Sequence, residues 1–172
     1  FWLVDPIDGT KEFIRGGESY TVNLSLVDRG SPVLSLVGVP EQQVVYCGSR
    51  STGLLSCDST DCTVWGPTTK TGKIQVLASR RDRLAVARFL EILDEDVDLK
   101  FMPSSRKLVQ VALGHGDMYL RFSATTHWDI VSGHGLVVTQ GGEVLTHSGK
   151  DLTYHLDRPK NPPHIALSKS VL

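Results

Sequence analysis

The chain has 172 residues, of which 40% are hydrophobic and 22% are charged, and its net charge is −1. This length is enough to bury the core of one domain or of two small lobes. The near-neutral charge argues against nucleic acid or an anionic membrane surface as a partner. No apolar stretch approaches the roughly 20 residues that a transmembrane helix needs. We expect a cytoplasmic protein with no membrane span.

The first 72 residues predict mainly β-structure. Residues 1–4 are apolar and precede turn-forming residues, which predicts a buried strand that Asp5 ends. Residues 20–27 alternate between apolar and polar side chains, as expected of a strand. Further strands are predicted at 33–39, 44–47 and 54–55, and one helical turn at 10–14. Short turns favour an antiparallel meander, and the polar segment 56–72 is predicted to be a seam between two lobes.

Residues 73–172 alternate between strand and helix patterns, which predicts an α/β lobe. Helices are predicted over 84–93, from Ser104 or Ser105 to 113, and from Trp128 or Asp129 to 139. Strands are predicted at 74–78, 101–102, 117–122, 143–145 and 165–168. The predicted fold class is therefore α/β, a layered sandwich with an α+β lobe at 1–72 and an α/β lobe at 73–172.

The three cysteines, Cys47, Cys57 and Cys62, are an odd number for a disulfide framework. Cys57 and Cys62 lack the CxxC spacing and a neighbouring histidine that a zinc site requires. We predict that all three are free thiols in a reducing compartment.

The motif DPIDGT, Asp5 to Thr10, has residue types suited to a metal and a phosphate. Asp5 and Asp8 lie on one bend, where their carboxylates and the Ile7 carbonyl can converge on a hard cation such as Mg²⁺. The N–H groups of Gly9 and Thr10 stand at a helix start, where phosphate is favoured. The alternative is a turn whose Asp, Pro and Gly residues serve only the backbone.

Three later stretches are weaker candidates. Asp129, at the predicted start of a helix, is either a third metal ligand or a partner of the helix dipole and cap. The basic stretches around Ser79-Arg80 and around Ser105-Lys107 either hold an anion or combine N-cap serines with solvated charges.

Together these motifs resemble the signatures of the inositol-monophosphatase-like superfamily of Mg²⁺-dependent, lithium-sensitive phosphatases. The string WLVDPIDGTKEFI, from Trp2 to Ile14, is most similar to the 3′(2′),5′-bisphosphate nucleotidases of the CysQ group. Inositol monophosphatases typically have Asn-Phe where this chain has Glu12-Phe13. The WD pair that precedes a helix of small residues, and the SSxK stretch from Ser104 to Lys107, support the same resemblance. It implies the sugar-phosphatase fold.

The resemblance also implies roles for individual residues. Two or three Mg²⁺ ions would be bound by Asp5, Asp8, Asp129 and the carbonyl of Ile7. Asp5 and Thr10 would be the catalytic residues, and Thr10 would position the attacking water. Residues near the substrate would be Gly9, Thr10, Ser79, Arg80, Ser105, Lys107 and Asp129.

This chain departs from the family pattern in three places. Arg81-Asp82 stand where the family often has Ser-His, and Ile130, Val131 and Ser132 replace alanines. Family members also carry a metal-binding Glu upstream of DPIDGT, for which this sequence offers no counterpart. We therefore expect a C-terminal portion of a longer phosphatase, or one segment of a chain cut in two.

The function that the resemblance implies is removal of the 3′-phosphate of adenosine 3′,5′-bisphosphate to give AMP, a step of sulfur metabolism. 3′-Phosphoadenosine 5′-phosphosulfate is a second expected substrate. An inositol or sugar phosphatase, and a non-catalytic module that binds metal or nucleotide, are the alternatives. The expected partner is a small-molecule nucleotide, and a homodimer or association with a separate N-terminal segment is left open.

Overall fold

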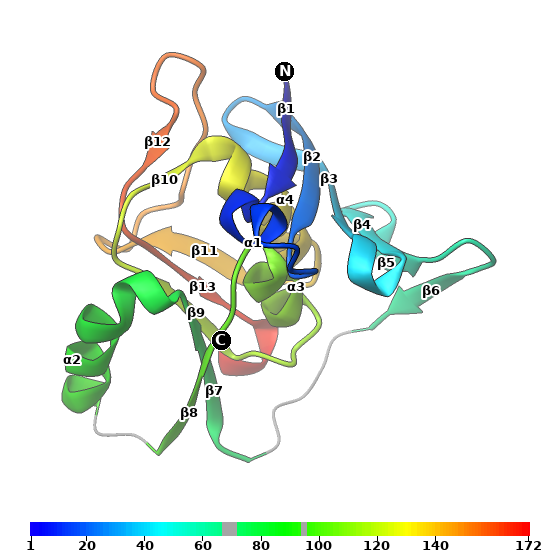
Figure 1. Cartoon of the computed structure of the whole chain (residues 1–172). Coiled ribbons are helices and arrows are strands. Elements are labelled where there is room, and N and C mark those ends of the chain that lie inside the picture. The colour runs from blue at the N-terminus through cyan, green and yellow to red at the C-terminus, as the bar shows by residue number, and fades with distance from the viewer. Residues whose placement is uncertain (67–71, 94–95) are drawn as a thin grey trace.

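The computed structural model describes residues 1–66, 72–93 and 96–172, which are arranged in layers (Figure 1). A six-stranded sheet from the first part of the chain packs mainly against one of two central helices. A five-stranded sheet from the second part packs on the other side of these helices, and a further helix covers its outer face. The predicted fold class, a layered α/β sandwich, is confirmed.

The six-stranded sheet consists of β1 (Trp2–Asp8), β2 (Thr21–Asp28), β3 (Ser31–Val39), β4 (Val44–Ser49), β5 (Gly53–Cys57) and β6 (Cys62–Trp65). Each strand pairs with the next, so the predicted antiparallel meander of β2, β3 and β4 is confirmed. A short helix, α1 (Thr10–Ile14), follows β1, and a 3-10 turn (Pro40–Gln42) joins β3 to β4.

Part of the buried face of this sheet, on β2 and β3, carries polar side chains. Thr21, Asn23 and Ser25 of β2 are at most 1% exposed, because helix α4 (His127–Thr139) packs on this side. Ser25 contacts Ser35 of β3, with 2.9 Å between the two hydroxyl oxygens. Because Asn23 pairs with Asp5 and Thr21 with Asp8, this polar face leads directly to the acidic motif.

The prediction that residues 1–4 form a buried strand is wrong in its burial. β1 is an edge strand, and Trp2 and Val4 lie on the face opposite α4, where they are 52% and 55% exposed. The strand also continues beyond Asp5 through Asp8, with a shift of register between these two residues. The acidic residues therefore lie within β1 rather than after it.

Helix α3 (Arg106–Ala112) and helix α4 form the layer between the two sheets. Two glycines of α4 permit this close packing. A Cβ atom at Gly133 would lie 2.6 Å from Cδ1 of Leu108 in α3, and one at Gly135 would lie 2.8 Å from Cβ of Ser35. Both distances are well below van der Waals contact, so any side chain there would push α4 away from its neighbours.

The five-stranded sheet has the order β11 (Glu143–Thr146), β13 (His164–Leu167), β9 (Met118–Arg121), β7 (Ile74–Ala78) and β8 (Val97–Phe101). β7 is parallel to β8 and β9, whereas β13 is antiparallel to β9 and β11. Val76 and Leu120 pack with Val86 of α2 (Arg83–Leu93) on the outer face, and Leu77 belongs to the core beneath α3 and α4. The remaining elements are β10 (Thr125–Thr126), β12 (Lys160–Asn161) and 3-10 turns at Arg80–Asp82 and Lys169–Val171.

Most predicted elements of the second part are present with shifted ends. The helix predicted from Trp128 or Asp129 begins at His127, and the strand predicted at 101–102 is the end of a longer strand, β8. The predicted boundary between two lobes falls beside residues 67–71, which lie outside the described part of the chain. The division into lobes therefore stays a prediction.

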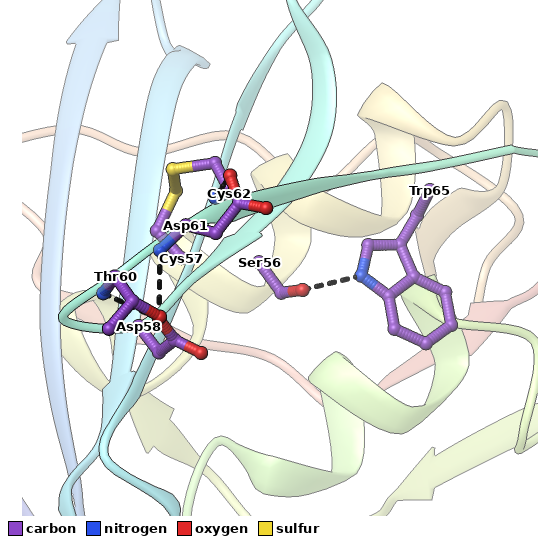
Figure 2. The surroundings of a disulfide bond; sticks show 7 residues. All are labelled: Ser56, Cys57, Asp58, Thr60, Asp61, Cys62 and Trp65. Carbon is purple, nitrogen blue, oxygen red and sulfur yellow. Dashed lines mark hydrogen bonds between the residues drawn. A yellow bond between two sulfur atoms is a disulfide. The ribbon is translucent and has the colours of Figure 1, made fainter.

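The segment predicted as a polar seam contains a β-hairpin formed by β5 and β6 (Figure 2). The Asp58 side chain accepts hydrogen bonds from the N–H and hydroxyl of Thr60 and from the N–H of Asp61, and these bonds hold the turn. The Trp65 indole donates a hydrogen bond of 2.8 Å to Ser56 across the two strands. The local turn chemistry thus extends the meander by one more pair.

The hairpin corrects the prediction about the cysteines. Cys57 and Cys62 stand opposite each other in register and form a disulfide, as Figure 2 shows, whereas Cys47 is free. The prediction of three free thiols is therefore wrong for Cys57 and Cys62. Their pairing depends on a hairpin that the polar composition of the segment does not reveal, and the argument for a reducing compartment loses its basis.

Candidate functional site

The motif DPIDGT lies at a bulged end of β1. Asp5 pairs with Asn23 and Asp8 with Thr21, so β1 has one more residue than β2 between these pairs. Pro6 lies in the bulge, where its lack of an N–H leaves no ladder hydrogen bond unmade. The bulge changes the direction of the chain between Asp5 and Asp8, whose carboxylates lie close together.

Asp129 joins the two aspartates of β1 from the first turn of α4. Each of the three carboxylates offers one oxygen, and these oxygens lie within 4.8 Å of one another. Asp129 Oδ2 accepts hydrogen bonds from the N–H and hydroxyl of Thr126, at 2.8 and 2.7 Å, in a capping box. The two interpretations of Asp129 are therefore compatible, because capping occupies only one of its oxygens.

The other two carboxylates are held in the same way, by hydrogen bonds to one oxygen. Asp8 Oδ2 accepts from the Ser105 N–H at 2.6 Å, the Ser105 hydroxyl at 2.8 Å and the Thr21 hydroxyl at 3.3 Å. Asp5 Oδ1 accepts from the N–H of Ile7 at 3.1 Å. In each aspartate the second oxygen is therefore the one suited to a cation.

The three carboxylates repel one another when ionised. Loss of water on burial, and then the negative charge of Asp8, raise the pKa of Asp5 to about 6, and Asp129 adds to this rise. The N–H of Ile7 acts in the opposite direction by stabilising the ionised form. A cation among these oxygens would relieve the repulsion, and a donor set of carboxylate and carbonyl oxygens fits a hard divalent ion.

The rest of the motif turns from β1 into α1. The Thr10 hydroxyl donates a hydrogen bond of 3.0 Å to the Ile7 carbonyl, which keeps a second lone pair available. Gly9 has φ 93°, a left-handed conformation that favours glycine, and α1 begins directly after it. Asp8, Gly9 and Thr10 all line a neighbouring cleft.

This cleft has a volume of about 420 Å³ and lies between the end of β1 and the second sheet. Asp8 and Asp129 are on one wall. Four cationic side chains also line it, namely Lys11, Arg81, Lys107 and Arg121. The cleft thus brings a site suited to a cation next to a site suited to an anion.

Lys107 is a buried cation on the cleft wall. Its ammonium group donates hydrogen bonds to the carbonyls of Met102 and Ser104, at 3.1 and 2.6 Å, and lies 5.4 Å from the centre of the Tyr119 ring. Burial lowers the pKa of Lys107 to about 8, although the nearby charge of Asp8 acts in the opposite direction. Lys107 is therefore largely protonated at neutral pH, with one of its three N–H groups left for a ligand.

Arg121 is held at the cleft by a buried carboxylate. Its Nη1 lies 3.4 Å from Oδ2 of Asp82, and its Nε donates to the carbonyl of Ser123 at 3.1 Å. Asp82 in turn accepts a hydrogen bond of 3.0 Å from the N–H of Ser123. These contacts fix the guanidinium group of Arg121 beside the cleft that it lines.

The structure separates the residues predicted near a substrate. Ser79 and Lys107 line the cleft, together with Arg81 in place of the predicted Arg80. Ser105 is buried against Asp8, and its neighbour Ser104 lines the cleft instead. The sequence analysis also did not predict several other lining residues, which are Lys11, Glu12, Pro103, Tyr119, Arg121, Thr125 and Ile130. For Arg121, the one available signal was a charge in the otherwise apolar run MYLRF.

The model of the inositol monophosphatase family matches residues 1–170. The chain belongs to the inositol monophosphatase family. Within this family it is 34% identical over 163 residues to the "3'(2'),5'-bisphosphate nucleotidase CysQ" of Salmonella typhimurium, and 33% identical to the protein of that name from Escherichia coli K12. These alignments cover 90% of this chain and 62% of each relative. The chain thus spans less than two thirds of the length of the curated relatives it matches.

Solved structures of the inositol monophosphatase family share the fold. A CysQ from Bacteroides thetaiotaomicron superposes with a TM-score of 0.88 at 28% identity, covering 98% of this chain and 70% of that chain. SuhB of Mycobacterium tuberculosis, at 23% identity and a TM-score of 0.76, supports the fold alone. Within the described residues, no helix has the length and apolar character needed to cross a membrane.

Proposed function

We propose that the whole protein is a Mg²⁺-dependent phosphomonoesterase that removes the 3′-phosphate of adenosine 3′,5′-bisphosphate to give AMP. 3′-Phosphoadenosine 5′-phosphosulfate is a second substrate under this proposal. The observation that carries it is the convergence of three carboxylates beside a cleft lined by four cations. The similarity to proteins named as 3′(2′),5′-bisphosphate nucleotidases supports the choice of substrate.

Asp5, Asp8, Asp129 and the carbonyl of Ile7 would hold two or three Mg²⁺ ions. When bound, the ions would activate water and neutralise phosphate charge. The fit rests on the chemistry of the donors, since Mg²⁺ prefers oxygen ligands and each aspartate has one oxygen committed elsewhere.

Residues of the turn after β1 would hold the phosphate that is removed. The backbone N–H groups of Gly9 and Thr10 stand at the start of α1 and can donate to phosphate oxygens. The Thr10 hydroxyl, now donating to the Ile7 carbonyl, would accept a hydrogen bond from the attacking water and orient it. Asp5 would act beside it as the second catalytic residue.

The opposite wall would bind the rest of the nucleotide. Lys107, Arg81 and Arg121 supply positive charge for a second phosphate, and Ser79 supplies a hydroxyl nearby. A substrate with two phosphate groups suits this wall better than one with a single phosphate, since the carboxylate site already accounts for the first. This charge distribution favours a bisphosphate nucleotide.

Phosphate release from the purified whole protein tests the proposal. Adenosine 3′,5′-bisphosphate should be turned over in Mg²⁺, EDTA should stop the reaction, and Asp8→Asn should abolish it. Inositol 1-phosphate, assayed in parallel, should be a much poorer substrate. Faster turnover of inositol 1-phosphate would replace the proposed substrate, and absence of turnover with both compounds would overturn the enzymatic function.

A further inference from the structure

Ser105 occupies a meeting point of the elements that carry the carboxylates. It precedes α3, is only 3% exposed, and contacts β1 through Asp8. Its hydroxyl also lies 2.9 Å from the backbone carbonyl of Asp129 at the start of α4 and 2.9 Å from Nδ2 of Asn23 in β2. A single side chain thus connects four elements of the site.

The direction of the Ser105 hydroxyl hydrogen follows from its neighbours. Asn23 Nδ2 lies 3.4 Å from the carbonyl of Trp128, and a carbonyl can only accept, so the amide nitrogen of Asn23 is the atom that faces this region. The same nitrogen donates to the Ser105 oxygen, which leaves the hydroxyl hydrogen free to point at an acceptor. An ionised carboxylate is a stronger acceptor than a backbone carbonyl, so the hydrogen points to Asp8.

Asp8 Oδ2 therefore receives two hydrogen bonds from Ser105, one from its N–H and one from its hydroxyl. A third comes from Thr21. Three donors to this one oxygen fix the rotation of the carboxylate, and Oδ1, to which no described residue donates a hydrogen bond, is left available to a cation. Ser105 does not line the cleft, whereas Ser104 does.

From this geometry we infer that Ser105 is a positioning residue for the metal ligand Asp8 and makes no contact with the substrate. Asn23 has a supporting role, because it orients the Ser105 hydroxyl. The inference rests on the metal site of the proposed function. Groups that orient a metal ligand typically contribute about 10–100-fold to metal affinity.

Mn²⁺, which suits the same oxygen ligands and is detected directly by electron paramagnetic resonance, is the probe. Ser105→Ala in the whole protein should weaken Mn²⁺ binding about 10–100-fold. Ser104→Ala is the matched control and should leave the Mn²⁺ affinity unchanged, because Ser104 makes no hydrogen bond to a described carboxylate of the site. Raising the metal concentration should restore kcat in Ser105→Ala at an unchanged KM.

A substrate contact at Ser105 predicts the opposite result, with an unchanged Mn²⁺ affinity and a raised KM at every metal concentration, and this would overturn the inference. If Ser105→Ala does not fold, Asn23→Ala provides the test, and an Mn²⁺ affinity equal to that of the unaltered protein would count against the positioning role. The Mn²⁺ titration needs no substrate. A protein that binds Mn²⁺ in a Ser105-dependent way but releases no phosphate would therefore contradict the proposed enzyme and leave this inference standing.

Discussion

The two walls of the cleft carry opposite charges and hold them by different means. The acidic wall, at the end of β1 and the start of α4, consists of Asp8 and Asp129, which line the cleft, together with Asp5 beside them, and backbone N–H groups and hydroxyls fix all three carboxylates. The basic wall, formed by α3, β9 and the 3-10 turn after β7, has Lys107 and Arg121 fixed by backbone carbonyls, an aromatic ring and a buried carboxylate.

This difference shows how a chain with a net charge of −1 can be suited to an anionic substrate. Each charged group has hydrogen-bond partners on its own wall, although the charges of Asp8 and Asp129 also stabilise the Lys107 ammonium group. We expect the two walls to be largely separable. Metal affinity should depend on the acidic wall, and the part of substrate affinity that comes from the second phosphate should depend on the basic wall. The predictions below test this independence.

Asp5→Asn should have the largest effect. It removes a proposed metal ligand, and the loss of several kcal/mol of transition-state stabilisation should lower kcat of the whole protein at least ~10³-fold. The change also removes a charge that repels Asp8 and Asp129, so the melting temperature without metal should rise at pH 7. Phosphate release, and thermal unfolding in EDTA, measure the two effects.

Asp157→Asn is the matched control for Asp5→Asn. Asp157 is exposed and pairs with its neighbour Arg158, and its replacement should change neither quantity. Full activity combined with a lower melting temperature in Asp5→Asn would show that Asp5 is structural, and the acidic wall would lose its proposed role.

Lys107→Met should affect the opposite wall. Removing a charge-assisted hydrogen bond to phosphate, about 1.5–3 kcal/mol, should raise KM roughly 10–100-fold. Mn²⁺ affinity should not fall, because Lys107 repels cations. Steady-state kinetics measure the change in KM, and a titration measures the change in Mn²⁺ affinity. Lys100→Met, at an exposed lysine, is the control for both. A parallel loss of metal affinity would show that the walls are coupled.

The sequence predicts the acidic wall better than the basic wall. Asp5 and Asp8 are close in the chain, so their convergence is a local property. For Asp129 the sequence leaves two roles open, helix capping and metal ligation. The structure makes them compatible, because capping uses only one of the two carboxylate oxygens. The meander is predictable for the same local reason, since strand alternation and short turns are visible in the sequence.

In the basic wall, the local backbone conformation decides which of two neighbouring residues lines the cleft. A 3-10 turn begins at Arg80 and brings Arg81 to the cleft. Ser104 has φ 52°, a left-handed conformation that is rare for serine. With this backbone conformation, Ser104 lines the cleft while the next residue, Ser105, is buried. Composition and periodicity do not contain this information, and the disulfide likewise required a hairpin register that no local pattern indicates.

Gly133→Ala tests whether the packing of α4 on α3 holds the two walls in place. The added methyl group would overlap Leu108 and should cost about 1–3 kcal/mol of unfolding free energy. Gly66→Ala is the control, because no atom of the described residues lies within 4 Å of a Cβ placed at Gly66. It should leave the unfolding free energy nearly unchanged. Chemical denaturation measures both variants, and equal stabilities would show that the helices can separate without loss.

Reduction of the disulfide should have a smaller effect, confined to stability. The cysteines are five residues apart, and closure of so short a loop contributes about 2 kcal/mol in the chain-entropy model. Trp65 contacts His115 and Gln140 beyond the C-terminal ends of α3 and α4, away from the cleft. Denaturation with and without reductant should show the loss, and the Cys57→Ser/Cys62→Ser variant should not respond. A large change in phosphate release on reduction would contradict the independence of the cleft from this hairpin.

The smallest predicted effect is a pH dependence that belongs to the basic wall alone. Burial lowers the pKa of Lys107 from 10.5 to about 8, so its charge is present below this pH and is lost as the pH rises through it. If only the protonated form binds phosphate, KM should double by pH 8 and rise about tenfold by pH 9. Lys107→Met should have a high KM that no longer changes over this range.

Measurement at saturating metal separates this titration from that of the carboxylates, because the ordinary pKa of an aspartate lies far below pH 8 and even the raised pKa of Asp5 is about 6. A KM that stays constant from pH 7 to 9 in the unaltered protein would mean that Lys107 serves the packing of α3 rather than the substrate.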